Sequence, residues 1–599
     1  MQPAESFFSL LSQVVLWQPR GGEPNREGRQ PSAGGFTAVA DMEASRVTFL
    51  LLCVVLAALL LAALFCVQRQ HAAAPLPQPH IVFILADDLG WNDVSYHGCP
   101  QIRTPNIDAL AWNGIRLRRY YTQPLCTPSR AALLTGRYPL NIGLQHSVIY
   151  NEEPRGLPLS ATLLPQWLAD LGYVTHHLGK WHIGFFKKEY TPTMRGFERH
   201  VGFWGAYIDY YKHEKTYLGS TQSPGLDMRR NFFLARNDSG RYVTELLTME
   251  ALEVIENHPE DKPLFLYLAH LAPHSASPQD PLQVPDKYVE QYRDIGSPER
   301  MKYAGMVSAL DESVGLVFEA LAKKGMLSNT LLAFSSDNGA DVAGPNANYG
   351  QSWPLRGQKY SPWEGGVRAP ALLWSHALGP KVRAGGDYEQ LFHIADWLPT
   401  LYQLAGGDLA DLGDIDGVSH ADALVGDASL LPPPRTELVV NIDPIDNYSA
   451  IIDGRFKLVK GVAEGGEYDQ WYPIVGNVDW NSTKPLEQCK ASPVARVLRS
   501  LGSEAACGPL GGASPINCGV RDSAKMCRPT VAPCLFDLDE DPCEYNDVAA
   551  EHPQLVKNLL STLRRYEDAS TPPANLPHDP LSDPGRYDNV WIPWRDRLP

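Results

Sequence analysis

The sequence predicts an α/β protein with a large, mostly parallel sheet between helices and a smaller C-terminal α+β subdomain. Strand-like and helix-like segments alternate between residues 80 and 430, as expected for parallel strands joined by crossover helices. Beyond residue 430, short strand-like segments follow one another closely, which favours antiparallel pairing. A chain of 599 residues, 44% of them hydrophobic, is long enough to bury a large core.

The expected elements can be read in chain order. "HIVFILADD" at 80–88 is a continuous apolar run, typical of a strand that is buried on both faces. "TPNIDALAWNG" predicts a helix with Thr104 as N-cap, Pro105 at its first position and Gly114 beyond its end. Further strands are expected in "GYVTHHLG", "KPLFLYLA" and "NTLLAFSSDNG", and further helices in "ATLLPQWLADLG" and "MKYAGMVSALDESVGLVFEALAKKG". The C-terminal subdomain is expected to contain strands "TELVVNID", "YSAIIDG" and "RFKLVKG" and the amphipathic helix "HPQLVKNLLSTLRRYED".

The N-terminal part of the chain carries a targeting signal. Residues 1–41 are polar and rich in Gly and Pro, which predicts a disordered or non-mature segment. The uncharged run Val47–Val67 within 42–74 is long enough for a transmembrane anchor, but "MEASR" before it and "HAAAP" after it also suit a cleaved signal peptide. Both interpretations send residues 75–599 into the secretory pathway, where the protein would be lysosomal, extracellular or membrane-anchored.

Cysteines and glycosylation sequons agree with an exported protein. Six of the ten Cys residues lie between 489 and 543 and predict up to three disulfides of open connectivity. A zinc site is the alternative, but this cluster has no CxxC pair. Asn237, Asn447 and Asn481 begin sequons and predict a glycoprotein. The net charge of −16 without a long basic run argues against nucleic-acid binding, although a local basic pocket could still hold an anionic substrate.

Oxygen-bearing side chains follow two of the expected strands. Asp87 and Asp88 end one strand, and Asp337 and Asn338 end another. Because ligands of parallel sheets bind beyond the carboxyl ends of the strands, these side chains predict a site for a hard cation, Ca²⁺ or Mg²⁺. The alternative is that "DD" is an exposed corner and "DNG" an ordinary turn.

Basic side chains could complete an anion site near these carboxylates. Lys180 and His182 are two residues apart in "LGKWHIG", so an extended backbone would point both the same way. His274 follows a strand, and Lys359 lies in the loop "WPLRGQKYSPWEGGVR". Each residue alone is more often a surface or packing residue. Together they predict an anion cradle with groups that transfer protons.

The segment "QPLCTPSRAALLTGRYP" places Cys126 near Arg130. Such a cysteine could be half of a disulfide, a thiol nucleophile or a site of modification. "CTPSRAALLTG" matches the sulfatase signature C-x-P-S-R with its downstream L-T-G, and the resemblance extends through "ADDLGWNDVSYHG", "GKWHIGFFKKEYTPTMRGF", "SSDNG" and "FHIADWLPTL". It covers 79–460 closely and 534–599 less closely. Through "GLQHS", "NIDP" and "VWIPW" the chain most resembles the arylsulfatase B group, the N-acetylgalactosamine-4-sulfatases.

This resemblance implies an alkaline-phosphatase-like sulfatase fold and a set of site roles. Cys126 would be oxidised to formylglycine by the formylglycine-generating enzyme, and its hydrated aldehyde would attack sulfur while Arg130 holds its environment. The resemblance implies one Ca²⁺ per subunit with the ligands Asp87, Asp88, Asp337, Asn338 and the modified Cys126. It also implies that Lys180 and Lys359 stabilise the sulfuryl oxygens. His274 with Lys359 would protonate the leaving alcohol. His182 would remove the proton whose loss releases sulfate.

The implied protein is an arylsulfatase-type sulfuric ester hydrolase that acts on a sulfated saccharide, such as N-acetylgalactosamine 4-sulfate units of glycosaminoglycans. Its catalytic domain would span 75–430, and its C-terminal subdomain would span 431–599 with a Cys-rich insert at 461–533. Three alternatives are a phosphate or phosphonate monoester hydrolase on the same scaffold, a non-catalytic binder of sulfated glycans, and a disulfide-linked structural ectodomain.

The chain departs from the family pattern at several places. The usual second Gly after "DNG" is Ala340, followed by Asp341 and the lengthened "VAGPNANYGQS". The cysteines expected after "GLQHS" are replaced, and the insert has no counterpart. These departures leave the substrate open. With Cys126 converted, an odd number of thiols remains, and we expect Cys99 to be unpaired.

Overall fold

The computed structural model describes residues 78–597, except 278, 379–381, 383–384, 427–430 and 509–515. The predicted N-terminal segment 1–41 and the apolar run Val47–Val67 lie outside these residues. None of the described helices has both the length and the apolar character that a membrane crossing requires.

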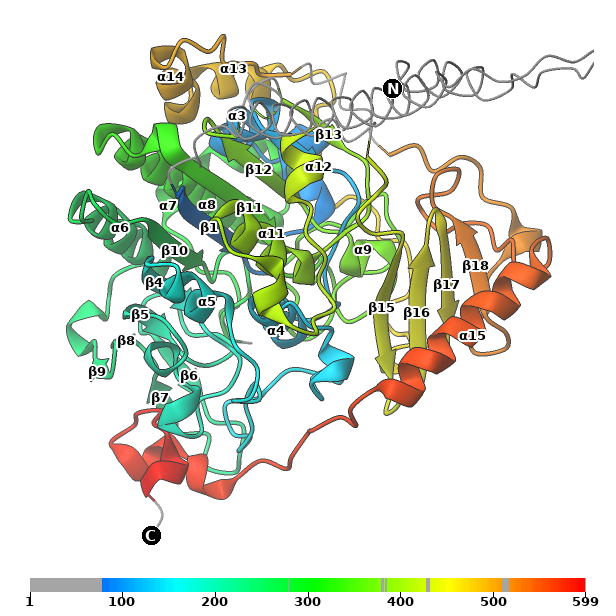
Figure 1. Cartoon of the computed structure of the whole chain (residues 1–599), viewed down its shortest axis with the longest axis horizontal. Helices are drawn as coiled ribbons and strands as arrows, with labels where there is room; N and C mark the ends of the chain where they lie inside the picture. Colours follow the sequence, from blue (N-terminus) through cyan, green and yellow to red (C-terminus); the bar gives the residue numbers. More distant parts are fainter. Residues whose placement is uncertain are drawn as a thin grey trace, which may run out of the picture. The chain divides into compact units, whose positions relative to one another are not determined.

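A ten-stranded mixed sheet, whose strands lie between His80 and Tyr388, forms the centre of what we call the larger part of the described chain (Figure 1). In spatial order its strands are β13 (Gly386–Tyr388), β2 (Ile115–Leu117), β12 (Ala371–Ser375), β11 (Thr330–Ser336), β1 (His80–Ala86), β10 (Leu264–Ala269), β4 (Val174–Lys180), β5 (Arg199–Phe203), β8 (Arg229–Arg230) and β9 (Phe233–Leu234). The central strands from β11 to β5 are all parallel, and antiparallel pairs occur toward both edges. The predicted mostly parallel sheet is therefore confirmed.

Helices cover both faces of this sheet, and β1 shows why its sequence is continuously apolar. Ile81, Phe83 and Leu85 belong to one hydrophobic cluster, whereas Val82 and Ile84 belong to another. The first cluster includes residues of α4 (Cys126–Thr135), α5 (Leu164–Asp170) and α11 (Trp397–Leu404), and the second includes residues of α3 (Pro105–Trp112), α6 (Val243–Glu256) and α8 (Pro298–Lys323). Alternate side chains of β1 thus pack into two hydrophobic cores, one on each face of the sheet.

Helix α3 begins where the sequence predicts, but its N-cap works differently. Thr104 occupies the N-cap position without accepting a hydrogen bond from a helix amide. Its hydroxyl instead donates to Asp108 at 2.8 Å and accepts from the Ser95 amide at 3.0 Å. Thr104 does not cap the helix because its hydroxyl bonds to the Asp108 carboxylate, one helical turn away.

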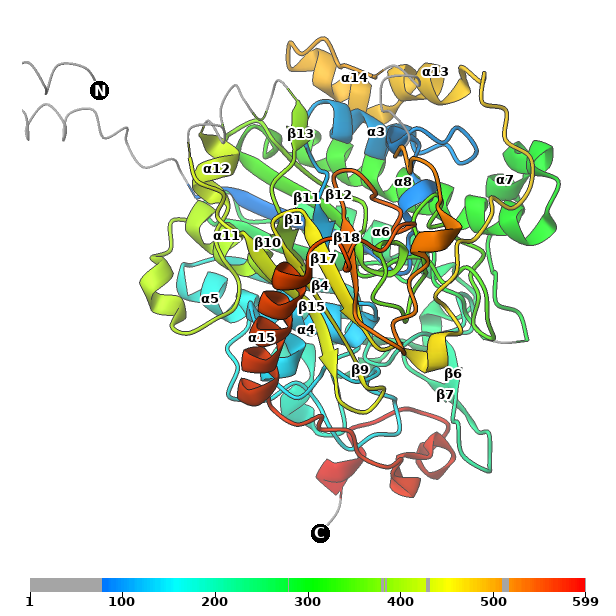
Figure 2. The same ribbon diagram turned by 90° about the vertical axis from the view of Figure 1, so that its right-hand side faces the viewer.

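The C-terminal strands form a separate four-stranded antiparallel sheet, as predicted (Figure 2). Its order is β15 (Glu437–Asp443), β16 (Tyr448–Asp453), β17 (Phe456–Lys460) and β18 (Cys534–Asp537). One face packs against α15 (Pro553–Ala569) and the other against residues next to α9 (Glu364–Val367). The remaining strands and short helices are β3 (Tyr120–Tyr121), β14 (Phe392–His393), β6 (Glu214–Thr216), β7 (Pro224–Leu226), α7 (Asp286–Val289) and α12 (Ala421–Val425).

A buried ion-pair network joins the small sheet to the larger part. The Lys457 ammonium on β17 lies 2.9 Å from carboxylate oxygens of both Glu364 and Glu544. The Tyr121 hydroxyl donates to Glu364 at 3.0 Å. Two carboxylates can share this buried site because one ammonium lies between them.

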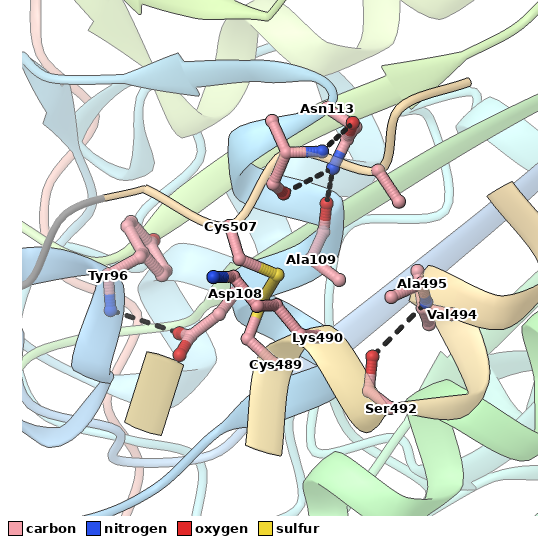
Figure 3. The surroundings of a disulfide bond; sticks show 12 residues. Tyr96, Asp108, Ala109, Asn113, Cys489, Lys490, Ser492, Val494, Ala495 and Cys507 are labelled. Carbon is pink, nitrogen blue, oxygen red and sulfur yellow. Dashed lines mark hydrogen bonds between the residues drawn. A yellow bond between two sulfur atoms is a disulfide. The ribbon is translucent and has the colours of Figure 1, made fainter. Parts of the chain in front are cut away.

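The Cys-rich insert packs on the larger part through two helices, α13 (Lys484–Ala491) and α14 (Pro493–Ser500). Figure 3 shows the Cys489–Cys507 disulfide beside α3, where Asn113 exchanges two hydrogen bonds with the Ala506 backbone. The other disulfides are Cys518–Cys543 and Cys527–Cys534, so the prediction for the late cysteines is confirmed. Cys99 and Cys126 are free and buried, so the prediction that Cys99 is unpaired is confirmed.

The chain returns to the larger part after α15. Trp591 and Trp594 are buried in the hydrophobic cluster that contains α4 and α5. The three sequon asparagines Asn237, Asn447 and Asn481 are exposed. The predicted division at residue 430 stays a prediction.

Candidate active site

The two predicted pairs of oxygen-bearing side chains meet at one edge of the large sheet. β1 and β11 are parallel neighbours, with Ala86 opposite Ser336, so the residues that follow them are adjacent. The Asp88 amide donates to Asp337 Oδ1 at 3.2 Å, and Asn338 Nδ2 donates to Asp88 Oδ1 at 2.7 Å. All four side chains are fully buried. The parallel register therefore creates the carboxylate cluster that the sequence predicts.

Cys126 lies beside this cluster as the first residue of α4. Its Sγ atom is 3.4 Å from Asp87 Oδ1 and 3.8 Å from Asp88 Oδ1. Burial, together with the negative charge of Asp337, raises the pKa of the Cys126 thiol well above its ordinary value. A cysteine at a helix N-terminus often has a lowered pKa, but here the surrounding carboxylates outweigh that effect. The unmodified side chain is therefore a neutral thiol and a weak nucleophile.

Arg130 lies one turn farther along α4 and supports the carboxylates. Its Nη2 is 2.8 Å from Asp337 Oδ2 and 3.4 Å from Asp87 Oδ1, and its Nη1 donates to the Lys180 carbonyl. Burial opposes the charge, but Asp337 and Asp87 hold the pKa of Arg130 above its usual range. Burial and the nearby Asp87 raise the pKa of Asp337 to about 6, although Arg130 opposes the shift. Removing either partner of this buried Arg130–Asp337 ion pair would leave the other charge unpaired, which would strongly destabilise the protein.

Lys180 ends β4 and points into the cluster, with its Nζ 2.6 Å from Asp87 Oδ2. His182 does not continue the strand: its φ is +58°, a left-handed conformation. The prediction that an extended backbone aligns these two side chains is therefore wrong, because the strand ends at Lys180. His182 is nevertheless buried, and its ring nitrogens have no hydrogen-bond partner among the described residues. Burial and the nearby Lys180 lower its pKa well below the ordinary value, so the ring is neutral.

Lys359 and His274 lie together on the other side of Asp88. Lys359 Nζ is 2.6 Å from Asp88 Oδ2 and 3.4 Å from His274 Nε2. His274 Nδ1 faces the Ser275 carbonyl. A carbonyl can only accept, so Nδ1 carries the ring hydrogen and Nε2 is free to accept from Lys359. Burial lowers the pKa of His274 to about 3, which leaves the ring neutral and Lys359 as the charged donor.

The cluster has the composition of a cation and anion site. Three cationic side chains face three carboxylates, and Asn338 Oδ1 is buried without a donor among the described residues. Carboxylate and amide oxygens fit a hard cation such as Ca²⁺. A compact group with ligand atoms within 4.8 Å of one another contains Asp87, Asp88, Cys126 and His274. This group has His274 where the sequence predicts Asp337, and we favour the oxygen set because Ca²⁺ prefers oxygen to imidazole.

Two nearby residues were not predicted as site residues. Asn348 is buried and donates to the backbone carbonyls of Asp88 and Pro273, which fixes the turns that carry Asp88 and His274. Asp341 is buried and accepts from the Tyr360 hydroxyl. In the sequence, Asn348 looks like an ordinary loop residue. Asp341 was noticeable only as a carboxylate added after "DNG".

Comparisons with known proteins identify the family and several relatives of this chain. The family model described as Sulfatase matches residues 79–407. The chain is similar to arylsulfatase J of Mus musculus, with 37% identity over 88% of this chain and 82% of that protein. It is also similar to N-acetylgalactosamine-6-sulfatase of Mus musculus, with 33% identity over 56% of this chain and 64% of that protein. The crystal structure of Ps i-CgsB in complex with k-i-k-neocarrahexaose superposes with a TM-score of 0.65 at 26% identity, over 87% of this chain and 98% of that chain.

Proposed function

This chain belongs to the sulfatase family of hydrolases, and from that premise we propose that it removes sulfate from sulfated sugars, with N-acetylgalactosamine 4-sulfate units of glycosaminoglycans as the expected substrate. The observation that carries this proposal is Cys126 enclosed by buried carboxylates, lysines and Arg130. The similarity to an N-acetylgalactosamine-6-sulfatase and to a structure with a bound carbohydrate supports a sugar substrate. The particular arylsulfatase B resemblance rests on the sequence motifs alone.

We propose that Cys126 acts after oxidation to formylglycine by the formylglycine-generating enzyme. The neutral, buried thiol is a weak nucleophile, so the site gains little from an unmodified cysteine. Formylglycine would supply a hydrated aldehyde with one hydroxyl to attack sulfur and a second whose deprotonation releases sulfate. Arg130 holds the first turn of α4 against Asp337 and keeps residue 126 beside the carboxylates.

The proposed metal is one Ca²⁺ per subunit. Asp87, Asp88, Asp337 and Asn338 would hold it together with the modified residue 126, and it would polarise the sulfuryl oxygens as a Lewis acid. Lys180 contacts Asp87 and Lys359 contacts Asp88, so the two lysines can hold the carboxylates in place and neutralise negative charge on the substrate.

The two histidines have different proposed roles because their surroundings differ. His274 accepts a hydrogen bond from the Lys359 ammonium at Nε2, so the Lys359–His274 pair is a proton source for the leaving alcohol. His182 is neutral and its ring nitrogens have no partner among the residues that the structure describes, which suits a base. Such acid–base assistance contributes roughly 10²–10⁴-fold to a rate.

The proposed location is the secretory pathway, with the catalytic part in a lumen or outside the cell. Three disulfides suit an oxidising compartment. The exposed Asn237, Asn447 and Asn481 are the proposed glycosylation sites. Cleavage of the run Val47–Val67 would release a lysosomal or extracellular protein, whereas an uncleaved run would anchor it in a membrane.

The direct test is an assay of the full chain, produced in cells that contain the formylglycine-generating enzyme. We expect release of sulfate from N-acetylgalactosamine 4-sulfate and from an aryl sulfate, and much slower release of phosphate from an aryl phosphate. Faster phosphate release would favour phosphate or phosphonate monoester hydrolysis. Tight binding of sulfated saccharides with no turnover of any ester would indicate a binding protein.

Replacing His182 tests the base. His182→Ala should release alcohol in a single burst while sulfate stays with the protein, and steady turnover should fall by roughly 10²–10⁴-fold, because the departure of sulfate needs a proton acceptor. Rapid-quench measurement of alcohol and free sulfate checks both products. The exposed His552 provides the control variant His552→Ala. Release of alcohol and sulfate in equal amounts from His182→Ala would remove this residue from that step.

A further inference from the structure

Asp341 and Tyr360 lie near Lys359, and neither they nor the nearby Tyr468 and Tyr472 have a role in the proposed chemistry. Asp341 and Tyr360 come from loops that follow β11, and Tyr468 and Tyr472 come from the segment after β17. We define these four residues as the tyrosine–aspartate subsite.

Asp341 has an unused acceptor. Its Oδ2 accepts from the Tyr360 hydroxyl at 3.2 Å, whereas its Oδ1 is buried and has no donor among the described residues. The side chain is only 1% exposed, and burial raises its pKa to about 7. A buried acceptor without a donor is costly, so its presence requires an explanation.

Asp341 is adjacent to the catalytic groups. The backbone amide of Lys359 donates to the Ala340 carbonyl at 3.0 Å, which ties the residue before Asp341 to the catalytic lysine. Tyr360 directly follows Lys359, and its amide donates to the Pro124 carbonyl, close to Cys126. Tyr360 adopts a left-handed φ of +78°, a conformation that non-glycine residues adopt at a cost. Backbone hydrogen bonds therefore tie Asp341 and Tyr360 to the segments that carry Lys359 and Cys126.

The insert supplies an aromatic surface next to Tyr360. The rings of Tyr360 and Tyr468 lie 5.0 Å apart at 31°. The segment that carries Tyr468 is attached to the active-site loop, because the Gly357 amide donates to the Gln470 carbonyl at 2.8 Å and Arg356 Nε donates to the Asp469 carbonyl at 2.9 Å. Tyr472, on the same segment, is partly buried.

We propose that the tyrosine–aspartate subsite binds the sugar ring that carries the sulfate, and that it selects rings with a free hydroxyl beside the ester over rings with a second anionic group there. A sugar offers hydroxyls that donate to Asp341 Oδ1, and its apolar face can pack on the tyrosine rings. A carboxylate or second sulfate at this position would be repelled by the ionised form of Asp341. The inference deepens the proposed function and rests on it.

The experiment compares Asp341→Asn with the parent protein on three esters: N-acetylgalactosamine 4-sulfate, N-acetylgalactosamine 4,6-disulfate and an aryl sulfate without a sugar. We expect the ratio of kcat/KM for the monosulfated sugar to that for the aryl sulfate to fall about 10-fold, since a neutral amide oxygen replaces the charged acceptor and weakens the hydrogen bond. The ratio for the disulfated to the monosulfated sugar should rise. The exposed Asp261 provides the matched control Asp261→Asn, which should change neither ratio.

A second variant tests the subsite even if Asp341→Asn does not fold. Tyr468 is only partly buried, and Tyr468→Leu should lower the same sugar-to-aryl ratio by removing the aromatic surface. If folded Asp341→Asn and Tyr468→Leu leave both ratios unchanged while the parent cleaves all three esters, the subsite is wrong and the proposed function stands. If the parent protein cleaves no ester, both the proposed function and this inference fail.

Discussion

Cys126→Ser is expected to abolish steady sulfatase turnover, with a loss on the order of 10⁶-fold, comparable to removal of the nucleophile in a covalent mechanism. Serine is similar in size and keeps an oxygen nucleophile at the start of α4, so the fold should be unchanged. A serine hydroxyl can accept the sulfuryl group but has no second hydroxyl on the same carbon to release it. Steady-state release of sulfate measures this effect directly.

The other free cysteine provides the control. Cys99 is also buried, but it lies outside the carboxylate cluster, so Cys99→Ser should keep near-parental turnover. Mass spectrometry of the parent peptide that contains residue 126 should show that sulfur is absent from this residue. Active protein with an intact thiol at Cys126, or near-parental turnover by Cys126→Ser, would contradict the proposed chemistry.

Asp337→Asn is expected to lower both stability and activity. The substitution removes the carboxylate that lies 2.8 Å from Arg130 Nη2, and breaking one side of a buried ion pair costs about 3–5 kcal/mol of unfolding free energy. It also removes a proposed Ca²⁺ ligand, so activity should require more added Ca²⁺ than the parent requires. Denaturant unfolding and a Ca²⁺ titration after chelation measure the two effects separately.

A substitution in a second buried ion pair distinguishes the loss of stability from the loss of Ca²⁺ binding. Asp396 is fully buried and accepts from Arg435 Nε at 2.8 Å, in a part of the described structure that contains none of the proposed ligands. Asp396→Asn should therefore destabilise the protein by a comparable amount without changing the Ca²⁺ requirement. An unchanged Ca²⁺ response in Asp337→Asn would remove Asp337 from the metal site.

Much of the fold was predictable because each element carries a local signal. "HIVFILA" is continuously apolar since β1 is buried on both faces, and Pro105 marks the first turn of α3. Thr104 was harder to interpret, because the sequence shows a capping residue but not its competing partner Asp108. The pairing of the late cysteines was open for the same reason: spacing along the chain does not reveal which two sulfurs meet.

Some features of the candidate active site were likewise predictable from the sequence, and others were not. Local patterns were enough to locate the strand ends that carry Asp87 and Asp337 and the signature that contains Cys126. The left-handed turn that carries His182, and the packing of Tyr360 against Tyr468 more than a hundred residues away, could not be found in this way. Side-chain direction and burial depend on contacts between distant segments, and such contacts leave no periodic trace in the chain.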